Sequence, residues 1–158
     1  DLSVMLNSVV AAQIKQNFIY RNWEAETDGN PLAHTILRGA VNKHGNAIPN
    51  YHYEDLQLLL EKYNERDLQN PATIVDANHS NSNKQFKEQI RIVKEVLHSR
   101  NVSGDIKKLV KGVMIESYLV EGSQKIGCEN HVYGKSITDP CLGWEDSRAL
   151  LHTIAELC

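Results

Sequence analysis

The sequence has few cysteines, and their spacing argues against a disulfide scaffold. Cys128, Cys141 and Cys158 are an odd number of thiols, and no CxxC pair occurs among them. Small disulfide-stabilised domains carry even numbers of cysteines at framework spacings. We therefore expect free thiols and a reducing, cytoplasmic environment.

Long hydrophobic runs and an excess of positive charge are also missing. No apolar run approaches the roughly 18 residues of a membrane-spanning helix. The first segment, DLSVMLNSVVAAQIKQNF, lacks a basic start and is interrupted by Ser, Asn and Gln, so it does not resemble a signal peptide. The formal net charge is −3, which gives no general nucleic-acid footprint. We expect neither a membrane nor a nucleic acid among the partners.

Two common catalytic motifs do not occur. The stretches SGD and EGSQKIG do not fit the GxxxxGK[ST] phosphate loop. Ser80, Ser82 and Ser136 lack the setting of a hydrolase nucleophile elbow. These absences argue against a P-loop enzyme and against a Ser–His–Asp hydrolase.

What is present is an ordinary globular composition, 41% hydrophobic and 23% charged, arranged as alternating strand and helix patterns. The patterns predict helices over residues 2–17, 51–65, 85–99 and 144–157, and strands over 17–23, 33–39, 72–77 and 109–116. The connecting segments read as a turn at 26–31, loops at 40–50 and 117–143, and a polar connection at 101–108. For the last helix we expect Leu150, Leu151, Ile154 and Leu157 to face inward.

This alternation predicts parallel βαβ units, which have a consequence for function. The strand ATIVDA is a continuous, largely apolar run, as expected for a strand buried on both faces. In parallel α/β folds the carboxyl ends of the strands open on one face, where active sites lie. Arg38, His79 and Glu116 each stand at such an end, about 40 residues apart, so we expect them to converge.

His79, Glu116 and Asp139 form a candidate metal triad. One imidazole and two carboxylates suit a divalent ion such as Mn, Fe, Co or Zn. Each residue also has a structural alternative: His79 could be a cap, and Asp139 before Pro140 could be a turn former. Glu116 is harder to explain as structure, because a carboxylate near a core needs a partner.

Basic residues near the strand ends are candidates for anion binding. Arg38 precedes Gly39, and its guanidinium could grip a phosphate or carboxylate in a bidentate way, or form a structural salt bridge. Lys84 and Lys135 lie in exit loops, where either could serve a phosphate or face water.

Four segments together closely resemble one family. HTILRG, DANHSNSNK, GVMIESYLVEG and YGKSITDPCLGWEDS match, in order and rough spacing, the class I (alpha type) 3-deoxy-D-arabino-heptulosonate 7-phosphate (DAHP) synthases. The resemblance runs through nearly all of the chain. It implies an α/β fold that is the C-terminal part of a (β/α)8 TIM barrel, with an inserted β-hairpin at roughly 18–38. Residues 1–158 would then be a single partial domain, without the N-terminal half of the family barrel.

The resemblance also implies a reaction and its residues. The family condenses phosphoenolpyruvate with erythrose 4-phosphate, the first step of the shikimate pathway to aromatic amino acids. His79, Glu116 and Asp139 match the family's metal ligands, Arg38 matches a residue that binds phosphoenolpyruvate, and we assign Lys135 to substrate binding as well. The cofactor would be a divalent Mn, Fe, Co or Zn ion, and the assembly a homo-oligomer, as a dimer or tetramer.

The chain departs from the family pattern in three ways. The family's fourth metal ligand, a cysteine of an early strand, has no counterpart, and Cys141 does not stand at that position. Basic residues of the earlier strands are absent, and the hairpin is shorter than in members inhibited by phenylalanine or tyrosine. The alternative to an enzyme is therefore an isolated non-catalytic fragment or assembly module, and we predict negligible synthase activity for the chain by itself. The related synthase of 3-deoxy-octulosonate 8-phosphate is disfavoured by SITDPCLGWEDS.

Overall fold

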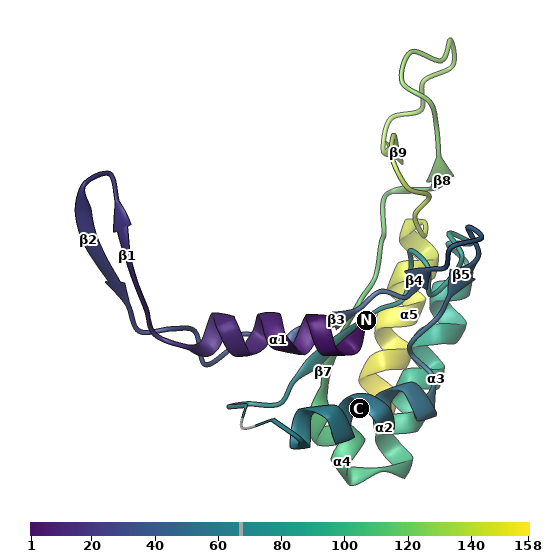
Figure 1. Cartoon of the computed structure of the whole chain (residues 1–158). Helices are drawn as coiled ribbons and strands as arrows, with labels where there is room; N and C mark the ends of the chain where they lie inside the picture. The colour runs from purple at the N-terminus through teal and green to yellow at the C-terminus, as the bar shows by residue number, and fades with distance from the viewer. Residues whose placement is uncertain (67) are drawn as a thin grey trace.

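The computed structural model describes residues 1–66 and 68–158 and shows a mixed α/β fold (Figure 1). Its parallel sheet consists, in spatial order, of β3 (Thr35–Leu37), β6 (Thr73–Asp76) and β7 (Val110–Met114). The helices that alternate with these strands are α2 (Tyr53–Asn64), α3 (Glu88–Val102), α4 (Gly104–Leu109) and α5 (Trp144–Leu157). The predicted alternation of strands and helices, and the parallel pairing that follows from it, are confirmed.

Helices cover one face of the sheet. Successive strand residues point to opposite faces, and Leu37 and Val75 are buried whereas Ile36 is 42% exposed. The core that buries them is completed by Leu56, Leu59, Tyr63, Ile92, Val93, Val96, Ile106, Leu109 and Leu150. Each fully buried aliphatic side chain stabilises the fold by about 1.5–3 kcal/mol. This one-sided core holds the strands in register and so sets where their carboxyl ends lie.

The helix faces follow the predicted spacing with two corrections in α5. Leu150 is 2% exposed and Ile154 packs against the core, but Leu151 is 62% exposed and Leu157 is 40% exposed. Leu151 lies about 100° around the helix from Leu150, outside the covered face. Leu157 lies nearly in line with Leu150, but it is the last residue of the helix. None of the helices within the described residues is long and apolar enough to cross a membrane.

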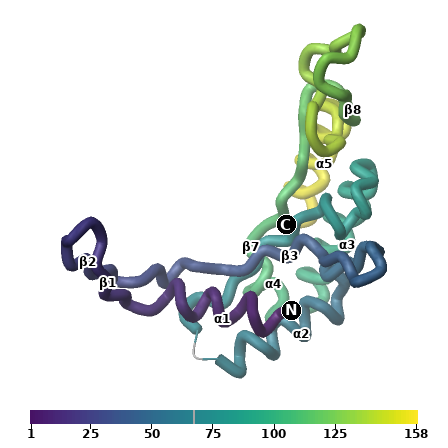
Figure 2. Tube along the Cα trace, turned by 45° about the horizontal axis from the view of Figure 1, so that its top comes forward, coloured from purple at the N-terminus to yellow at the C-terminus, as the bar shows by residue number. Residues whose placement is uncertain are grey.

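An antiparallel hairpin follows α1 (Leu2–Gln13) and extends away from the sheet (Figures 1 and 2). It pairs β1 (Gln16–Tyr20) with β2 (Trp23–Thr27). The predicted single strand over 17–23 is therefore corrected to a hairpin, whose strands cover 16–27 and not roughly 18–38. Of the turn predicted over 26–31, residues 26 and 27 belong to β2, and the turn is confirmed only for the part that follows β2. The chain reverses at Arg21 and Asn22, whose φ angles of 50° and 65° are the left-handed pair that a two-residue hairpin loop requires. Arg21 carries no turn signal, which is why the sequence pattern missed the reversal.

The segment 101–108, predicted to be a polar connection, contains helix α4. Ser103 caps it, because its hydroxyl oxygen accepts a hydrogen bond from the Ile106 amide at 3.3 Å. Ile106 and Leu109 are buried on the same side. The predicted loop over 40–50 likewise contains a short antiparallel pair, β4 (Ala40–Val41) and β5 (Ala47–Ile48).

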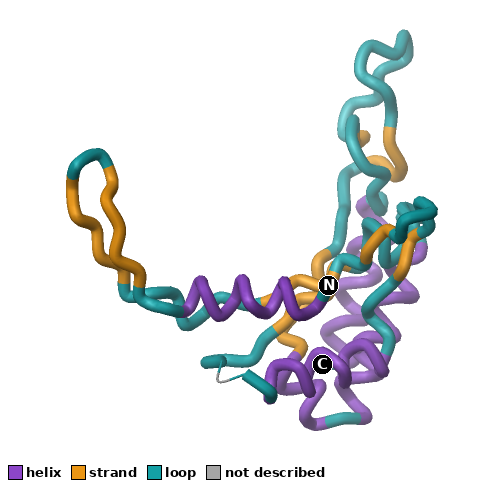
Figure 3. Tube along the Cα trace, viewed as in Figure 1, coloured by secondary structure: helices purple, strands orange, loops and turns teal. Residues whose placement is uncertain are grey.

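The long loop predicted over 117–143 is present and projects beyond the carboxyl end of β7 (Figure 3). It contains the short parallel pair β8 (Val120–Ser123) and β9 (Lys135–Ser136). Gln124 joins the two sides of this loop: its side-chain amide nitrogen donates to the carbonyls of Val132 and Lys135 at 2.8 and 2.9 Å. After β9 the chain returns to the carboxyl ends of the parallel strands, where Asp139 lies.

Candidate metal centre

Three side chains with ligand atoms meet beyond the carboxyl ends of the strands. His79 follows β6, Glu116 follows β7 and Asp139 follows β9, and their ligand atoms all lie within 4.8 Å of one another. His79 Nε2 is 3.2 Å from Glu116 Oε1 and 3.6 Å from Asp139 Oδ2. The convergence predicted from the strand ends is present for His79 and Glu116, and Asp139, the third candidate ligand, lies beside them. Arg38, the other strand-end residue, is not part of this group, and we call His79, Glu116 and Asp139 the triad.

The spacing within the triad suits one divalent ion. Two ligands bound at about 2.1 Å to a common ion, at tetrahedral or octahedral angles, lie about 3.0–3.5 Å apart. The distances from His79 Nε2 to the two carboxylates are close to that range. The three side chains are 21%, 26% and 32% exposed, so an ion could enter from solvent.

The loop that carries His79 is held by buried polar side chains. His79 has a φ of 45°, a left-handed conformation that the surrounding hydrogen bonds stabilise. Asn81 donates through Nδ2 to the carbonyls of Leu37 and Asp76, at 3.1 and 2.7 Å. Asn81 thereby joins the ends of β3 and β6 directly beneath the triad.

Two supporting residues were not predicted from the sequence. Asp76 is almost fully buried, and its Oδ2 lies 2.7 Å from His79 Nδ1. Its position three residues before the histidine, at the end of the strand, was a signal that could have found it. Gln89 of α3 is fully buried and exchanges two hydrogen bonds with the backbone of Glu116, at 2.8 and 3.1 Å. Its place within a helix offered no comparable signal.

Lys84 contacts the triad through Asp139. Its Nζ lies 2.9 Å from Asp139 Oδ1. This hydrogen bond is the main reason that the pKa of Asp139 lies below its ordinary value, and the charges of Lys84, His79 and Arg38 act in the same direction. Asp139 is therefore held in the ionised form that a metal ligand requires.

The two predicted substrate-binding residues lie outside the triad. Arg38 is exposed at the end of β3 and lines a hollow of about 440 Å³ with Gly39 and Asn50. Lys135 is half-buried, and a Cβ atom placed on Gly122 would lie 3.8 Å from its Nζ. It lines a second hollow, of about 500 Å³, with Tyr118 and Tyr133.

Cys141 lies close to the triad without belonging to it. Its thiol donates to the carbonyl oxygen of Asp139 at 3.4 Å. Burial raises the pKa of the Cys141 thiol, so the side chain stays protonated and is a poor metal ligand. All three cysteines of the chain are free thiols.

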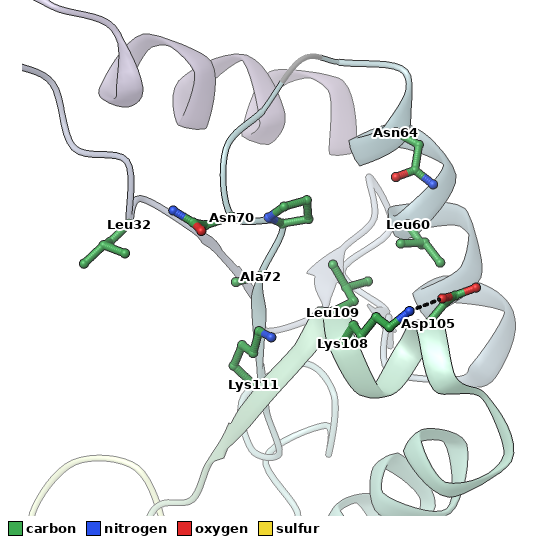
Figure 4. Close-up of a pocket in the computed structure, with 10 residues that line it drawn as sticks. Leu32, Leu60, Asn64, Asn70, Ala72, Asp105, Lys108, Leu109 and Lys111 are labelled. Atoms are coloured by element: carbon green, nitrogen blue, oxygen red, sulfur yellow. Dashed lines mark hydrogen bonds and ion pairs between the residues drawn. The ribbon is translucent and has the colours of Figure 1, made fainter.

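A larger cavity lies at the amino ends of the strands, opposite the triad. It has a volume of about 670 Å³, and Ala72 and Leu109, which precede β6 and β7, line it (Figure 4). Its charged lining is Lys111 and the Lys108–Asp105 pair, which is 3.3 Å apart and exposed. Active sites of parallel α/β folds lie at the carboxyl ends of the strands, so the triad and not this cavity is the candidate site.

Comparisons with known proteins identify the family to which the chain belongs. The sequence profile of the DAHP synthetase I family matches residues 4–152. The Trp-sensitive phospho-2-dehydro-3-deoxyheptonate aldolase of Shigella flexneri is 40% identical over 132 residues, which are 82% of this chain and 35% of that protein. The Trp-sensitive enzyme of Buchnera aphidicola is 35% identical, over 98% of this chain and 43% of that protein.

A solved structure is similar over almost the whole chain. The phospho-2-dehydro-3-deoxyheptonate aldolase of Francisella tularensis matches with a TM-score of 0.85 and 30% identity, covering 99% of this chain and 45% of that chain. This chain thus spans less than half the length of the relatives it matches. Because the family profile covers nearly all of its residues, the chain belongs to the DAHP synthetase I family.

Proposed function

We propose that this chain provides the metal ligands and part of the substrate site of a phospho-2-dehydro-3-deoxyheptonate aldolase (DAHP synthase). The reaction would condense phosphoenolpyruvate with erythrose 4-phosphate at the start of the shikimate pathway. The observation that carries the proposal is the convergence of His79, Glu116 and Asp139 within 4.8 Å at the carboxyl edge of the sheet. The names of the similar proteins support the same activity.

The chain's own residues have distinct tasks in this reaction. His79, Glu116 and Asp139 would hold a divalent Mn, Fe, Co or Zn ion, which would supply Lewis-acid polarisation of the aldehyde of erythrose 4-phosphate. Arg38 holds an anionic group of phosphoenolpyruvate and orients its carbon 3 toward the aldehyde carbon. Lys135 binds a phosphate group as a point charge.

The fold proposed for the complete site is a (β/α)8 barrel with β1 and β2 as an inserted hairpin. Three parallel strands with helices on one face support this, and the parallel bridge between Ser117 and Leu142 adds the start of a further strand. Ile36 is 42% exposed on the uncovered face, where the interior of a barrel would bury it. Residues 1–158 are one partial domain of this barrel.

Manganese binding tests the metal site. We expect one Mn²⁺ per chain in a titration followed by electron paramagnetic resonance. His79→Gln, Glu116→Gln and Asp139→Asn each replace one ligand with an amide, a weaker donor, and should weaken binding about 10- to 100-fold. Glu121→Gln is the matched control, because Glu121 is an exposed carboxylate that pairs with Lys87 at 2.9 Å. Wild-type affinity in Glu116→Gln would contradict the assignment.

A non-catalytic assembly module is the second candidate. The sheet favours it, because β3 and β7 each pair on one side only among the described strands, and unpaired strand edges recruit further chains. We also propose a homo-oligomer, a dimer or tetramer, supported by the exposed apolar side chains of Phe18, Ile19 and Trp23 on the hairpin. The free thiols support a cytoplasmic location.

A further inference from the structure

The two ring nitrogens of His79 face different partners. Nδ1 lies 2.7 Å from Asp76 Oδ2, while Nε2 faces the carboxylates of Glu116 and Asp139. The side chain of Asp76 is 3% exposed, so water does not compete for its oxygens. The ring is therefore held on one side by a buried carboxylate and presents its other nitrogen to the triad.

The Asp76 carboxylate is itself fixed by the backbone. Its Oδ1 accepts a hydrogen bond from the Asn78 amide at 2.8 Å. An ionised carboxylate only accepts hydrogen bonds. The 2.7 Å contact with the buried Asp76 Oδ2 therefore favours the proton of a singly protonated ring on Nδ1, because the nearest carboxylate oxygen to Nε2, Glu116 Oε1, is more exposed and 3.2 Å away. The lone pair then lies on Nε2, where a metal ion can take it.

We propose that Asp76 is a positioning residue that fixes the tautomer and orientation of His79. This inference rests on the proposed metal site. Asp76 does not act as a ligand itself, because its Oδ2 binds the ring nitrogen that points away from the triad. Its contribution is to keep Nε2 unprotonated and aimed between Glu116 and Asp139.

The substitution Asp76→Asn separates this role from simple packing. The backbone N–H of Asn78 still needs an acceptor, so the side-chain carbonyl oxygen of the new asparagine stays beside it. Its NH₂ group then faces His79 Nδ1 and must donate to it. The ring proton is thereby forced onto Nε2, and the lone pair is removed from the triad in a side chain of almost the same shape.

Nuclear magnetic resonance of the metal-free, ¹⁵N-histidine-labelled full chain reads the tautomer directly, at a pH at which the ring carries one proton. His79→Gln assigns the signal. We expect an Nδ1–H ring in the wild type, an Nε2–H ring in Asp76→Asn, and Mn²⁺ affinity in that variant lower by about 10- to 100-fold. Asp55→Asn is the matched control, because Asp55 also accepts a backbone hydrogen bond, from His52 at 3.1 Å; it should change neither property.

The wild-type spectrum tests the inference even if the variant does not fold. A wild-type ring with its proton on Nε2 would overturn it, and so would an Asp76→Asn chain that keeps the Nδ1–H ring and the wild-type Mn²⁺ affinity. Absence of Mn²⁺ binding in the wild type, with the predicted tautomers observed, would instead refute the proposed metal site. The two failures are therefore distinguishable.

Discussion

Side chains of the triad are held in two different ways. Asp76 and Gln89 are buried and fix His79 and Glu116 through short hydrogen bonds. Asp139 instead depends on Lys84, whose side chain is 64% exposed. An exposed ion pair contributes about 1 kcal/mol or less and weakens with salt. Asp139 is therefore the triad member most sensitive to solution conditions.

Removing Lys84 should raise the pKa of Asp139. Because the pKa of Asp139 is lowered in the folded chain, the pair stabilises the fold at pH values above the unfolded-state pKa of about 3.9. This contribution is lost as the pH falls through the lower pKa of the folded chain. In Lys84→Met we expect the pKa of Asp139 to return toward its ordinary value, measured from its carboxyl ¹³C shift in the metal-free chain. Lys108→Met, which removes the Asp105 partner at 3.3 Å, is the control and should leave Asp139 unchanged. An unchanged Asp139 titration in Lys84→Met would contradict the role of the ammonium.

At the scale of the elements, the segment after β3 lies very close to the loop that follows β6 and carries His79. Gly39 follows the end of β3, and a Cβ there would lie 2.8 Å from Ser80 Cβ and 2.9 Å from the Asn81 nitrogen. Such distances are shorter than real Cβ contacts, and the φ of 73° already favours glycine. The loop that bears His79 therefore packs directly on the end of β3.

The pair Gly39→Ala and Gly45→Ala isolates that close approach. Both glycines have positive φ, at 73° and 82°, but nothing lies within 4 Å of a Cβ at Gly45. We expect Gly45→Ala to lower the free energy of unfolding by about 1 kcal/mol, and Gly39→Ala by about 2 kcal/mol more. Denaturant titration measures both; equal losses would show that the approach of the loops does not matter.

Helices and strands were predictable where the hydrophobic periodicity was strong. They were missed where only a few residues determine the local conformation. The residues 144–157 form α5 as predicted, because Leu150 and Ile154 recur at helical spacing and both pack against the core. Helix α4 was missed, because its buried residues Ile106 and Leu109 are too few to show a period. The hairpin turn was missed because it depends on only two residues in the left-handed conformation, Arg21 and Asn22.

At the scale of the whole molecule, the parallel sheet has two open edges within the part of the chain that the structure describes. Among the described strands, β3 and β7 lie at the edges, and Ile36 and Met114 are 42% and 38% exposed. Relatives have more than twice the length that this chain matches. A closed barrel would pair the edges and bury such residues, whereas the chain alone keeps the triad open to water.

We expect the 158-residue chain to consume phosphoenolpyruvate negligibly when it is assayed alone with erythrose 4-phosphate and Mn²⁺. Water competes at an open site for the ion and the anionic substrates. The assay is repeated after refolding with the part of the Francisella tularensis enzyme that this chain does not match, and activity should then appear. The Glu116→Gln chain in the same mixture is the control and should remain inactive. Full activity of the chain alone would contradict the prediction.

The sequence by itself determined the alternation of the three parallel strands with α2, α3 and α5. It thereby determined the end of the sheet at which His79 and Glu116 lie, because parallel connections send every strand end to one side. Its motifs also identified the family, which the comparisons confirm. Only the tertiary structure decided the supports, namely Asp76 beside Nδ1, Gln89 on the backbone of Glu116, and Lys84 on Asp139. Hydrophobic periodicity records which face of an element is buried, whereas a hydrogen bond depends on distances of a few ångströms between atoms that meet only after the elements have packed.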